Sequence, residues 1–417
     1  MENAVVGLDV GTTKICTVVA RPLGDGRLEV LGVGVVPSLG LKRGVVVDLQ
    51  DAVESIRRSV QRAQESSALE IRSAYVGITG DHVTSLNVAG RTIVSAGTEV
   101  TPEDCERVLQ AARDNVGNLG PNREIVHVIP REFALDGQPG IRRPVGMSGR
   151  RLEVAAHVVT GVKSILENVE KCVVAAGVQV LEKVLEPIAT AEAVLTPAER
   201  ELGVALIDVG GGTADVAVFL DGSICHTSAI PVAGNHVTRD LAIGLRVPVE
   251  QAEDLKRKAG VALAAQADDR QRVGIRLAGT GEPQQVPRRL LGEIIQPRLE
   301  EILNLARTDL KRSGFYDLIG GVVLTGGGCL LPGTLELASK VLDDNRVRLG
   351  EPQGITGLVA PISGPAFGTS VGLAMYGAAR LAEAPEPPPP LAAAPEPWFR
   401  HAAGKAADLF RRLIRRA

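Results

Sequence analysis

Apolar and polar residues alternate in blocks that predict strands and helices in turn along most of the chain. Short apolar runs bounded by Gly, Pro or polar residues are typical of buried strands, and apolar residues three or four apart are typical of amphipathic helices. The expected strands are residues 5–10, 15–20, 204–209, 216–220 and 321–325, and the expected helices are residues 49–64, 165–177, 250–259 and 290–313. This mixture predicts an α/β body.

The segment 83–161 has a different pattern. It contains one helix whose start is marked by Thr101 as the N-cap, Pro102 at the first helical position and Asp104 where a capping-box acid is found. Apolar runs follow it, separated by Pro, Gly and Arg. One helix with a few strands predicts a small inserted α+β subdomain.

Composition narrows the class of protein. A chain of 417 residues exceeds the usual size of one hydrophobic core, so at least two domains are expected. Only 2% of the residues are aromatic, so the core must consist mainly of Val, Leu, Ile and Ala. The formal net charge of −3 gives no indication of nucleic-acid binding by the whole chain. The five Cys are scattered without metal-ligand spacing, which favours reduced thiols in a reducing compartment.

A short motif occurs twice in the body. The stretch LDVGTTKICTVV, which begins at Leu8, resembles IDVGGGTADVAVF, which begins at Ile207. Both consist of a strand, an Asp, a turn of Gly and Thr, and a second strand, which predicts two β-hairpins in two related halves. Gly in such a turn lets consecutive backbone N–H groups approach an anion. Neither copy is a Walker A loop, because each turn leads into a strand and the sequence contains no GxxxxGK[ST].

Each hairpin places an Asp at the end of an apolar strand. Asp9 and Asp208 would be costly there without compensation, since a carboxylate loses hydration on burial. A hydrated Mg²⁺ held between them would offset this cost, because Mg²⁺ favours carboxylates, water and phosphate. A single Asp-x-Gly could simply make a tight turn, but the two copies together favour a phosphate and metal site.

Two further segments are candidates for contact with a nucleotide. The cluster Gly326, Gly327 and Gly328 follows a buried strand and is expected to open a helix, so that a sugar and base could lie against its backbone. The second segment is a predicted helix with three charged residues, for which a solvated i,i+3 charge pair is an equally good interpretation. These residues are Glu253, Lys256 and Arg257.

The two hairpins, the third Gly cluster and the stretch LEPIATAEAVL at 185–195 resemble, in this order, the nucleotide-binding motifs of the actin/Hsp70/sugar-kinase superfamily. In that superfamily two α/β lobes clamp ATP and Mg²⁺ in a cleft. The resemblance implies an actin-like two-lobed ATPase fold in which Asp9 and Asp208 hold Mg²⁺ through water and Glu186 and Thr213 are candidate catalytic residues. It also implies phosphate contacts for Gly11, Thr12, Thr13, Lys14, Gly210, Gly211, Gly212 and Thr213, and ribose or adenine contacts for Glu253, Lys256, Arg257, Gly326, Gly327 and Gly328.

Within this superfamily, three features resemble the FtsA family of bacterial cell-division proteins. The insert lies where FtsA has its extra subdomain, and it includes RRPVGMSGRRLEVAAHVVTG at 142–161. The stretches AERELGVALIDVGGGTADVAVF and GPAFGTSVGLAMYG resemble FtsA in the identity and spacing of their residues. The body is followed by a linker and a short basic tail. The resemblance implies a body over 1–381, with the insert at 83–161 and a second lobe at 196–360 whose smaller subdomain is 236–320.

The end of the chain has its own pattern. The Pro- and Ala-rich stretch 382–397 predicts an extended linker. Residues 398–417 contain six Lys or Arg and one Asp, together with the chain's one Trp and two of its six Phe. At about 100° per residue the apolar side chains occupy one side of a helix, which is typical of an amphipathic helix in a membrane interface. Docking of this helix on a protein partner or on the body of the chain is the alternative. The expected membrane residues are Trp398, Phe399, Leu409, Phe410, Arg411, Arg412, Leu413 and Ile414.

The FtsA resemblance implies an ATP-binding protein that polymerises on the cytoplasmic face of the inner membrane and tethers FtsZ filaments there during septum formation. Weak ATP hydrolysis is compatible with this role. The implied partners are the C-terminal peptide of FtsZ, other copies of the chain, membrane lipids and later division proteins. A small-molecule kinase and a pilus-assembly adaptor of the same superfamily are the alternatives. We find no carboxylate base for a kinase after Leu185, and the tail favours the membrane adaptor.

Overall fold

The structure is a computed structural model and describes residues 4–95, 99–343 and 346–383. The described residues up to Ala378 form one compact unit, and the chain divides after Ala378. The eight expected membrane residues, from Trp398 to Ile414, lie outside the described residues, as do residues 384–397 of the expected linker.

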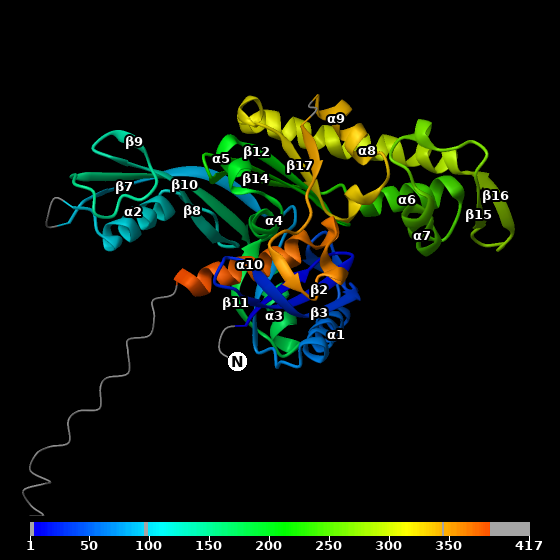
Figure 1. Ribbon diagram of the computed structural model, residues 1–417, viewed down its shortest axis with the longest axis horizontal. Coiled ribbons are helices and arrows are strands. Elements are labelled where there is room, and N and C mark those ends of the chain that lie inside the picture. Colours follow the sequence, from blue (N-terminus) through cyan, green and yellow to red (C-terminus); the bar gives the residue numbers. More distant parts are fainter. Residues whose placement is uncertain (1–3, 96–98, 344–345, 384–417) are drawn as a thin grey trace, which may run out of the picture. The chain divides into compact units, whose positions relative to one another are not determined.

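The N-terminal lobe is built on a six-stranded mixed sheet (Figure 1). Its strands are β1 (Val5–Val10), β2 (Lys14–Pro22), β3 (Leu28–Pro37), β6 (Ser73–Ile78), β11 (Gln179–Leu185) and β19 (Ile355–Gly357); its helices are α1 (Leu49–Ser67) and α3 (Lys163–Ala175); and a small hairpin joins β4 (Leu41–Lys42) to β5 (Val45–Val46). The strand order is β11-β6-β1-β2-β3-β19. The pairs β1–β2 and β2–β3 are antiparallel, so the first repeated motif forms a hairpin as predicted.

The second lobe is built on a five-stranded sheet in which the second motif forms the equivalent hairpin. The elements are β12 (Val204–Val209), β13 (Ala214–Leu220), β14 (Ser223–Ile230), β17 (Val322–Thr325), β18 (Val347–Leu349), α5 (Pro197–Leu202), α8 (Arg288–Ser313) and α9 (Thr334–Leu342). The strand order is β14-β13-β12-β17-β18, and β12 and β13 are antiparallel. Between β14 and α8 the chain forms a smaller group of elements: α6 (Gly234–Leu245), α7 (Val249–Ala259), β15 (Arg272–Arg276) and β16 (Pro283–Pro287).

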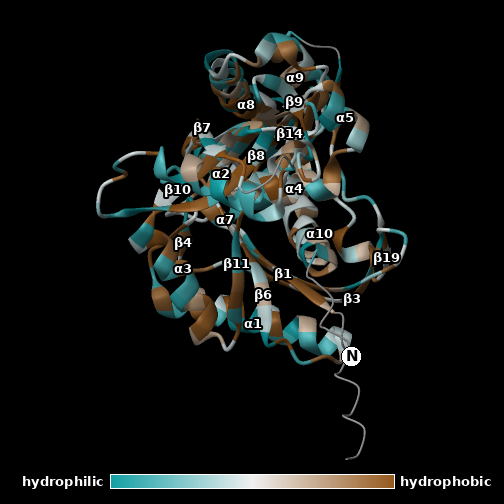
Figure 2. Ribbon diagram, turned by 90° about the vertical axis from the view of Figure 1, so that its left-hand side faces the viewer, coloured by the Kyte–Doolittle hydropathy of each residue, from teal (hydrophilic) through white to brown (hydrophobic). Residues whose placement is uncertain are grey.

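Two helices, α4 (Glu186–Val194) and α10 (Gly368–Glu383), form the layer between the two sheets. One buried cluster joins Val18 of β2, Val194 of α4, Leu206 of β12 and Ala374 of α10. The far face of the first sheet packs on α1 and α3, and the far face of the second packs on α8 and α9. Figure 2 shows brown and teal residues alternating along α1, as expected for a helix with one buried face. The layers therefore run helix, sheet, helix, sheet, helix.

The insert forms a sheet and helix of its own. Its elements are β7 (Thr84–Ile93), α2 (Pro102–Asp114), β8 (Arg123–Leu135), β9 (Gln138–Ile141) and β10 (Arg151–Val162), with strand order β7-β10-β8-β9. The capping box predicted for α2 is confirmed, because Thr101 accepts from the Asp104 N–H and Asp104 accepts from the Thr101 N–H. β7 joins the second lobe through Asn87, whose amide donates to the Cys225 carbonyl of β14 over 3.0 Å.

Three details differ from the sequence expectation. The second lobe was expected to reach residue 360, but β19 pairs with β3 and so belongs to the first sheet. The Gly326–Gly328 cluster does not open an α-helix directly: a 3-10 turn covers Gly327–Leu330, and α9 begins at Thr334 after Pro332 and a left-handed Gly333. Helix α10 ends at Glu383, two residues inside the expected linker. Other 3-10 turns lie at Ala264–Gln266, Tyr316–Leu318, Ala360–Ile362 and Pro365–Phe367.

The contact between α4 and α10 depends on a glycine. A Cβ added at Gly372 of α10 would overlap the Ala189 carbonyl of α4, which is backbone and cannot rotate away. We expect Gly372→Ala to lower the free energy of unfolding by about 3 kcal/mol, because overpacking separates the two helices. Gly364→Ala, where an added Cβ has nothing within 4 Å, is the matched control and should change it by less than about 0.5 kcal/mol. Urea unfolding followed by circular dichroism measures both, and equal midpoints for the two variants would contradict this packing.

Candidate functional site

Strand alternation turns Asp9 and Asp208 toward the layer between the two sheets. Leu8 of β1 packs in the cluster with α1 and α3, and Ile207 of β12 packs in the cluster with α8. Successive side chains of a strand point to opposite faces, so each Asp that follows points to the α4 and α10 side. The carboxylates of the two repeated motifs therefore face a common layer, as the repeat suggested.

The glycine turns of the two hairpins touch each other. A Cβ added at Gly211 would overlap the Thr13 hydroxyl, and one added at Gly212 would lie 2.6 Å from Thr12 Oγ1. Glycine is therefore required at both positions by the close approach of the other lobe. Because the turns are in contact, a phosphate chain can lie between them only if the two turns move apart.

The first hairpin carries a buried ion pair. Lys14 Nζ lies 2.9 Å from Asp9 Oδ2, and the same ammonium lies 5.2 Å from the centre of the Phe367 ring. Burial opposes the charge on Lys14, but Asp9, together with Cys16 and Asp208, outweighs this effect, so the pKa of Lys14 is raised above its usual value. Lys14 is thus a cation at neutral pH beside the turn Gly11–Thr13.

The second hairpin carries two carboxylates that oppose each other. Asp208 and Asp215 are cross-strand partners in the β12–β13 ladder, an arrangement that destabilises like charges. The hydroxyls of Thr190 on α4 and Thr369 on α10 each lie 3.3 Å from Asp208 Oδ2. Burial, reinforced by Asp9 and opposed by Lys14, raises the pKa of Asp208 to about 6.

Asp215 links the two lobes. It accepts hydrogen bonds from Thr79 Oγ1, which follows β6 of the first lobe, over 2.6 Å and from Thr213 Oγ1 over 3.1 Å. Burial and the nearby Asp208 charge raise the pKa of Asp215 to about 7, although both hydroxyls favour the ionised form. The candidate catalytic residue Thr213 is 4% exposed, and its hydroxyl is engaged by this carboxylate.

Glu186 begins α4 at the same layer. Its Oε1 is buried and has no hydrogen-bond partner among the described residues. Burial, followed by the charges of Asp9, Asp215 and Asp208, raises the pKa of Glu186 well above its usual value. A buried acceptor without a donor is uncommon in proteins, so this carboxyl is available to a ligand or to water.

The site therefore has an excess of negative charge. The carboxyl groups of Asp9, Glu186, Asp208 and Asp215 influence one another, and Lys14 is the cation whose charge acts on this cluster. Among the described residues, no three His, Cys, Asp or Glu side chains gather at metal-ligand spacing. The donor set thus fits a Mg²⁺ held largely through water and phosphate rather than through a cage of protein ligands.

The remaining predicted site residues lie beside the second turn or further away. A Cβ added at Gly328 would lie 2.9 Å from the Val209 carbonyl, and one at Gly326 would overlap Asp208, so these two glycines pack directly on the end of β12. A Cβ added at Gly327 would make only an ordinary contact, 3.9 Å from Ala366 Cβ. Lys256 pairs with Glu253 over 2.6 Å and donates to the Gly234 carbonyl over 3.2 Å. Arg257 is exposed.

Four polar residues of the site were missed by sequence reasoning. Asp215, Thr190 and Thr369 each lie inside a quoted motif, at positions that alternation and the start of a helix could have placed in the site. Thr79 carries no such signal, because only the fold brings the end of β6 against β13.

Comparison with known proteins places the chain in a family. The chain is 43% identical to Cell division protein FtsA of Pseudomonas aeruginosa over 374 residues, which cover 89% of each chain. The chain belongs to the FtsA family. Cell division protein FtsA of Escherichia coli K12 is 37% identical over 384 residues, 90% of each chain. The family models that match are "Cell division protein FtsA" at residues 205–372 and "SHS2 domain inserted in FTSA" at residues 80–160.

Solved structures agree on the fold. A chain of the PilM-PilN type IV pilus biogenesis complex matches with a TM-score of 0.64 at 17% identity, covering 90% of this chain and 98% of that one. The predicted actin-like α/β fold with an inserted subdomain is thus confirmed, and FtsA membership makes this chain an actin-like cell-division protein. Within the described residues no helix is both long and apolar enough to span a bilayer.

Proposed function

We propose that the chain binds ATP with Mg²⁺ between the two hairpin turns and acts as a nucleotide-dependent adaptor in cell division. The observation that carries the proposal is the cluster of four carboxyl groups around Lys14 where the two turns meet. Such a cluster is unfavourable by itself and becomes favourable when a divalent cation supplies the missing positive charge.

Different residues at and near the two turns would bind the phosphates, the metal, the attacking water and the nucleoside. The backbone of Gly11, Thr12 and Thr13 and that of Gly210, Gly211 and Gly212 would hold the phosphates, with Lys14 as their cation. Asp9 and Asp208 would hold Mg²⁺ through water, and the metal would neutralise charge on the phosphates. Glu186 would orient water and accept its proton once the cation has lowered its pKa. The Gly326–Gly328 cluster and the Glu253–Lys256 pair would flank the ribose and base.

Removing the metal tests this site. We expect the full chain to bind ATP with an affinity that falls about 10-fold or more when a chelator replaces Mg²⁺, since charge on the phosphates would then face four carboxyl groups. Isothermal titration calorimetry with ATP, with and without the chelator, gives both affinities. Equal affinity under the two conditions would contradict a metal held by Asp9 and Asp208.

We further propose that the protein assembles into filaments and holds FtsZ filaments on the inner membrane at the division septum. Membership of the FtsA family supports the division role. The smaller group of elements in the second lobe, near residues 231–320, would bind the C-terminal peptide of FtsZ, and the insert would contact other copies or later division proteins. Residues 398–417 would bind lipid through an apolar face and a local net charge of +5, reached through a Pro-rich linker.

A further inference from the structure

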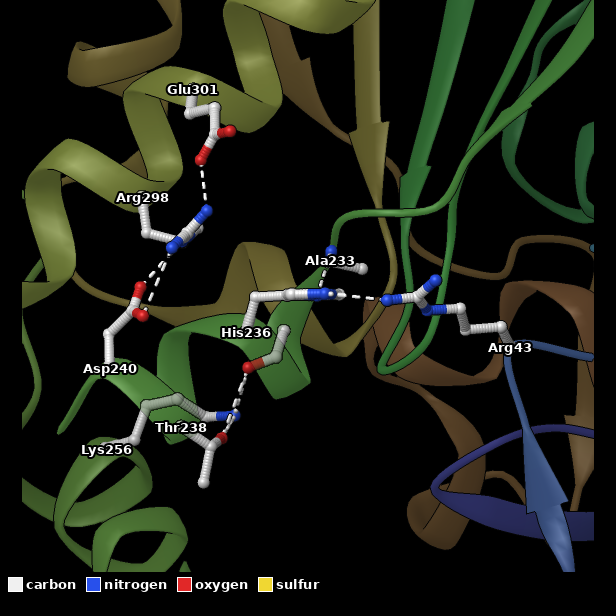
Figure 3. A network of polar contacts seen from close by, with 9 residues as sticks. Arg43, Ala233, His236, Thr238, Asp240, Lys256, Arg298 and Glu301 are labelled. Atoms are coloured by element: carbon white, nitrogen blue, oxygen red, sulfur yellow. Dashed lines mark hydrogen bonds and ion pairs between the residues drawn. The ribbon is translucent and has the colours of Figure 1, made fainter. Parts of the chain in front are cut away.

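Arg43 and His236 face each other across the contact between the two lobes (Figure 3). Arg43 lies in the turn between β4 and β5 of the first lobe, and His236 lies in the first turn of α6 in the second. Arg43 Nη2 and His236 Nε2 are 3.4 Å apart. Neither residue belongs to a motif that the sequence singled out.

The position of the proton on the His236 ring leaves the contact with Arg43 without a hydrogen-bond acceptor. The N–H of Ala233 donates to His236 Nδ1 over 3.1 Å, so Nδ1 carries no proton. Burial, followed by the charges of Arg43 and Arg298, lowers the pKa of His236, so the ring is neutral at pH 7. Its proton is then on Nε2, and Nε2–H points at the guanidinium of Arg43. Two donors face each other with no acceptor between them.

The surrounding charges leave Arg43 without a counter-ion. Asp240 of α6 is paired with Arg298, whose Nε lies 2.6 Å from Asp240 Oδ2 (Figure 3), and Glu253 is paired with Lys256. Within the described part of the chain no Asp or Glu lies within ion-pair distance of Arg43. A positive charge and a neutral donor therefore converge on one point, and an anion is the ligand that satisfies both.

The backbone at Arg43 is held in an unfavourable conformation beside the glycine turns of the two hairpins. Its φ is 52°, a left-handed value that costs a non-glycine residue about 1 kcal/mol or more. Its Cα lies 3.0 Å from where a Cβ of Gly212 would be, and the next residue, Gly44, donates its N–H to Thr12 Oγ1 over 3.3 Å. The strained residue thus lies against both turns, and strain of this kind concentrates at functional sites.

We propose that Arg43 and His236 form a phosphate clasp, in which both side chains donate to the oxygens of one phosphate group when the two turns separate around a ligand. The ligand chemistry is a phosphate at the outer end of the nucleotide: the terminal phosphate of a nucleoside triphosphate, or free phosphate beside the diphosphate. The clasp rests on the proposed nucleotide site and adds to it a selection for the triphosphate form.

Arg43→Gly is the most informative variant, because glycine accepts the left-handed backbone and the variant cannot fail through strain. We expect it to lower ATP affinity about 10-fold or more while changing ADP affinity less than about 2-fold, since a charge-assisted hydrogen bond to phosphate is lost. Arg43→Gln should behave in the same way. Lys42→Gln removes the same charge from the adjacent exposed residue and should leave both affinities unchanged.

Calorimetric titration of the full chain with ATP, with ADP, and with ADP in the presence of inorganic phosphate separates the outcomes. If the Arg43 variants lose affinity for ATP alone, the clasp binds the attached terminal phosphate. If inorganic phosphate raises the ADP affinity of the wild type but not that of the variants, the clasp binds free phosphate. If the variants lose affinity for ATP and ADP equally, or for neither, the clasp is wrong. Nucleotide binding by the wild type would still support the nucleotide site in that case. A wild-type chain that binds no nucleotide and no phosphate overturns both.

Discussion

Asp208→Asn is expected to make the nucleotide-free protein more stable at pH 8 while weakening its binding of ATP with Mg²⁺ about 10-fold or more. The two effects have one cause. Asp208 is half-buried opposite Asp215, and its pKa is raised to about 6, so its ionised form opposes folding at pH 8. Raising the pKa from its ordinary value of 3.8 to about 6 corresponds to a gain of about 3 kcal/mol at pH 8 when the charge is removed. Asparagine keeps an acceptor for Thr190 and Thr369 but cannot attract the metal.

The pH dependence gives this prediction a sign. A carboxyl whose pKa is higher in the folded than in the unfolded protein binds more protons when folded, so stability falls as pH rises between about 4 and 6. The stabilisation of Asp208→Asn relative to the wild type should therefore be largest at pH 8 and nearly vanish at pH 4. Asp215, with its pKa raised to about 7, extends the same fall in wild-type stability to near pH 7.

Thermal unfolding from pH 4 to 8 and calorimetric titration with ATP and Mg²⁺ measure the two effects. Asp221→Asn is the matched control, because Asp221 is an exposed turn residue after β13 with a φ of 52°, which asparagine tolerates. That control should change neither quantity. A variant at Asp208 that binds ATP with wild-type affinity would contradict the metal site, and one that unfolds earlier at pH 8 would contradict the electrostatic account.

Removing residues 398–417 is expected to abolish binding to anionic liposomes while leaving ATP affinity unchanged. Six cations near an anionic surface contribute about 1 kcal/mol each, and burial of Trp398, Phe399 and the Leu and Ile side chains adds to this. Loss of both terms lowers membrane affinity by several orders of magnitude.

Liposome co-sedimentation measures this loss. A tail with the same residues in scrambled order keeps the charge of +5 but loses the apolar face, and it should bind more weakly than the natural tail. Equal binding by natural and scrambled tails would mean that charge alone attaches the protein. Binding that survives the deletion would place the membrane contact elsewhere in the chain.

The parts of the fold that follow local rules could be predicted from the sequence. The hairpins at β1–β2 and β12–β13 have short apolar strands around Gly and Thr turns, and α2 has a capping box, so pattern and turn chemistry agree there. The repeat of the motif then indicated that Asp9 and Asp208 act together, since two similar halves place equivalent residues in equivalent positions.

Contacts between distant segments could not be predicted in this way. β19 is a strand of three residues whose pairing with β3 depends on where the chain returns, not on its own composition. Thr79 and Asp215 meet because the lobes meet, and Arg43 meets His236 for the same reason. The members of these pairs lie far apart in the sequence, so no local pattern of residues indicates that they meet.

The most direct test of the account is recruitment of the C-terminal peptide of FtsZ to anionic liposomes by the full chain in the presence of ATP and Mg²⁺. We expect the peptide to sediment with liposomes when the full chain is present, and to stay in solution with the chain that lacks residues 398–417. Peptide that reaches the liposomes without residues 398–417, or that fails to reach them with the full chain bound, would contradict the tether.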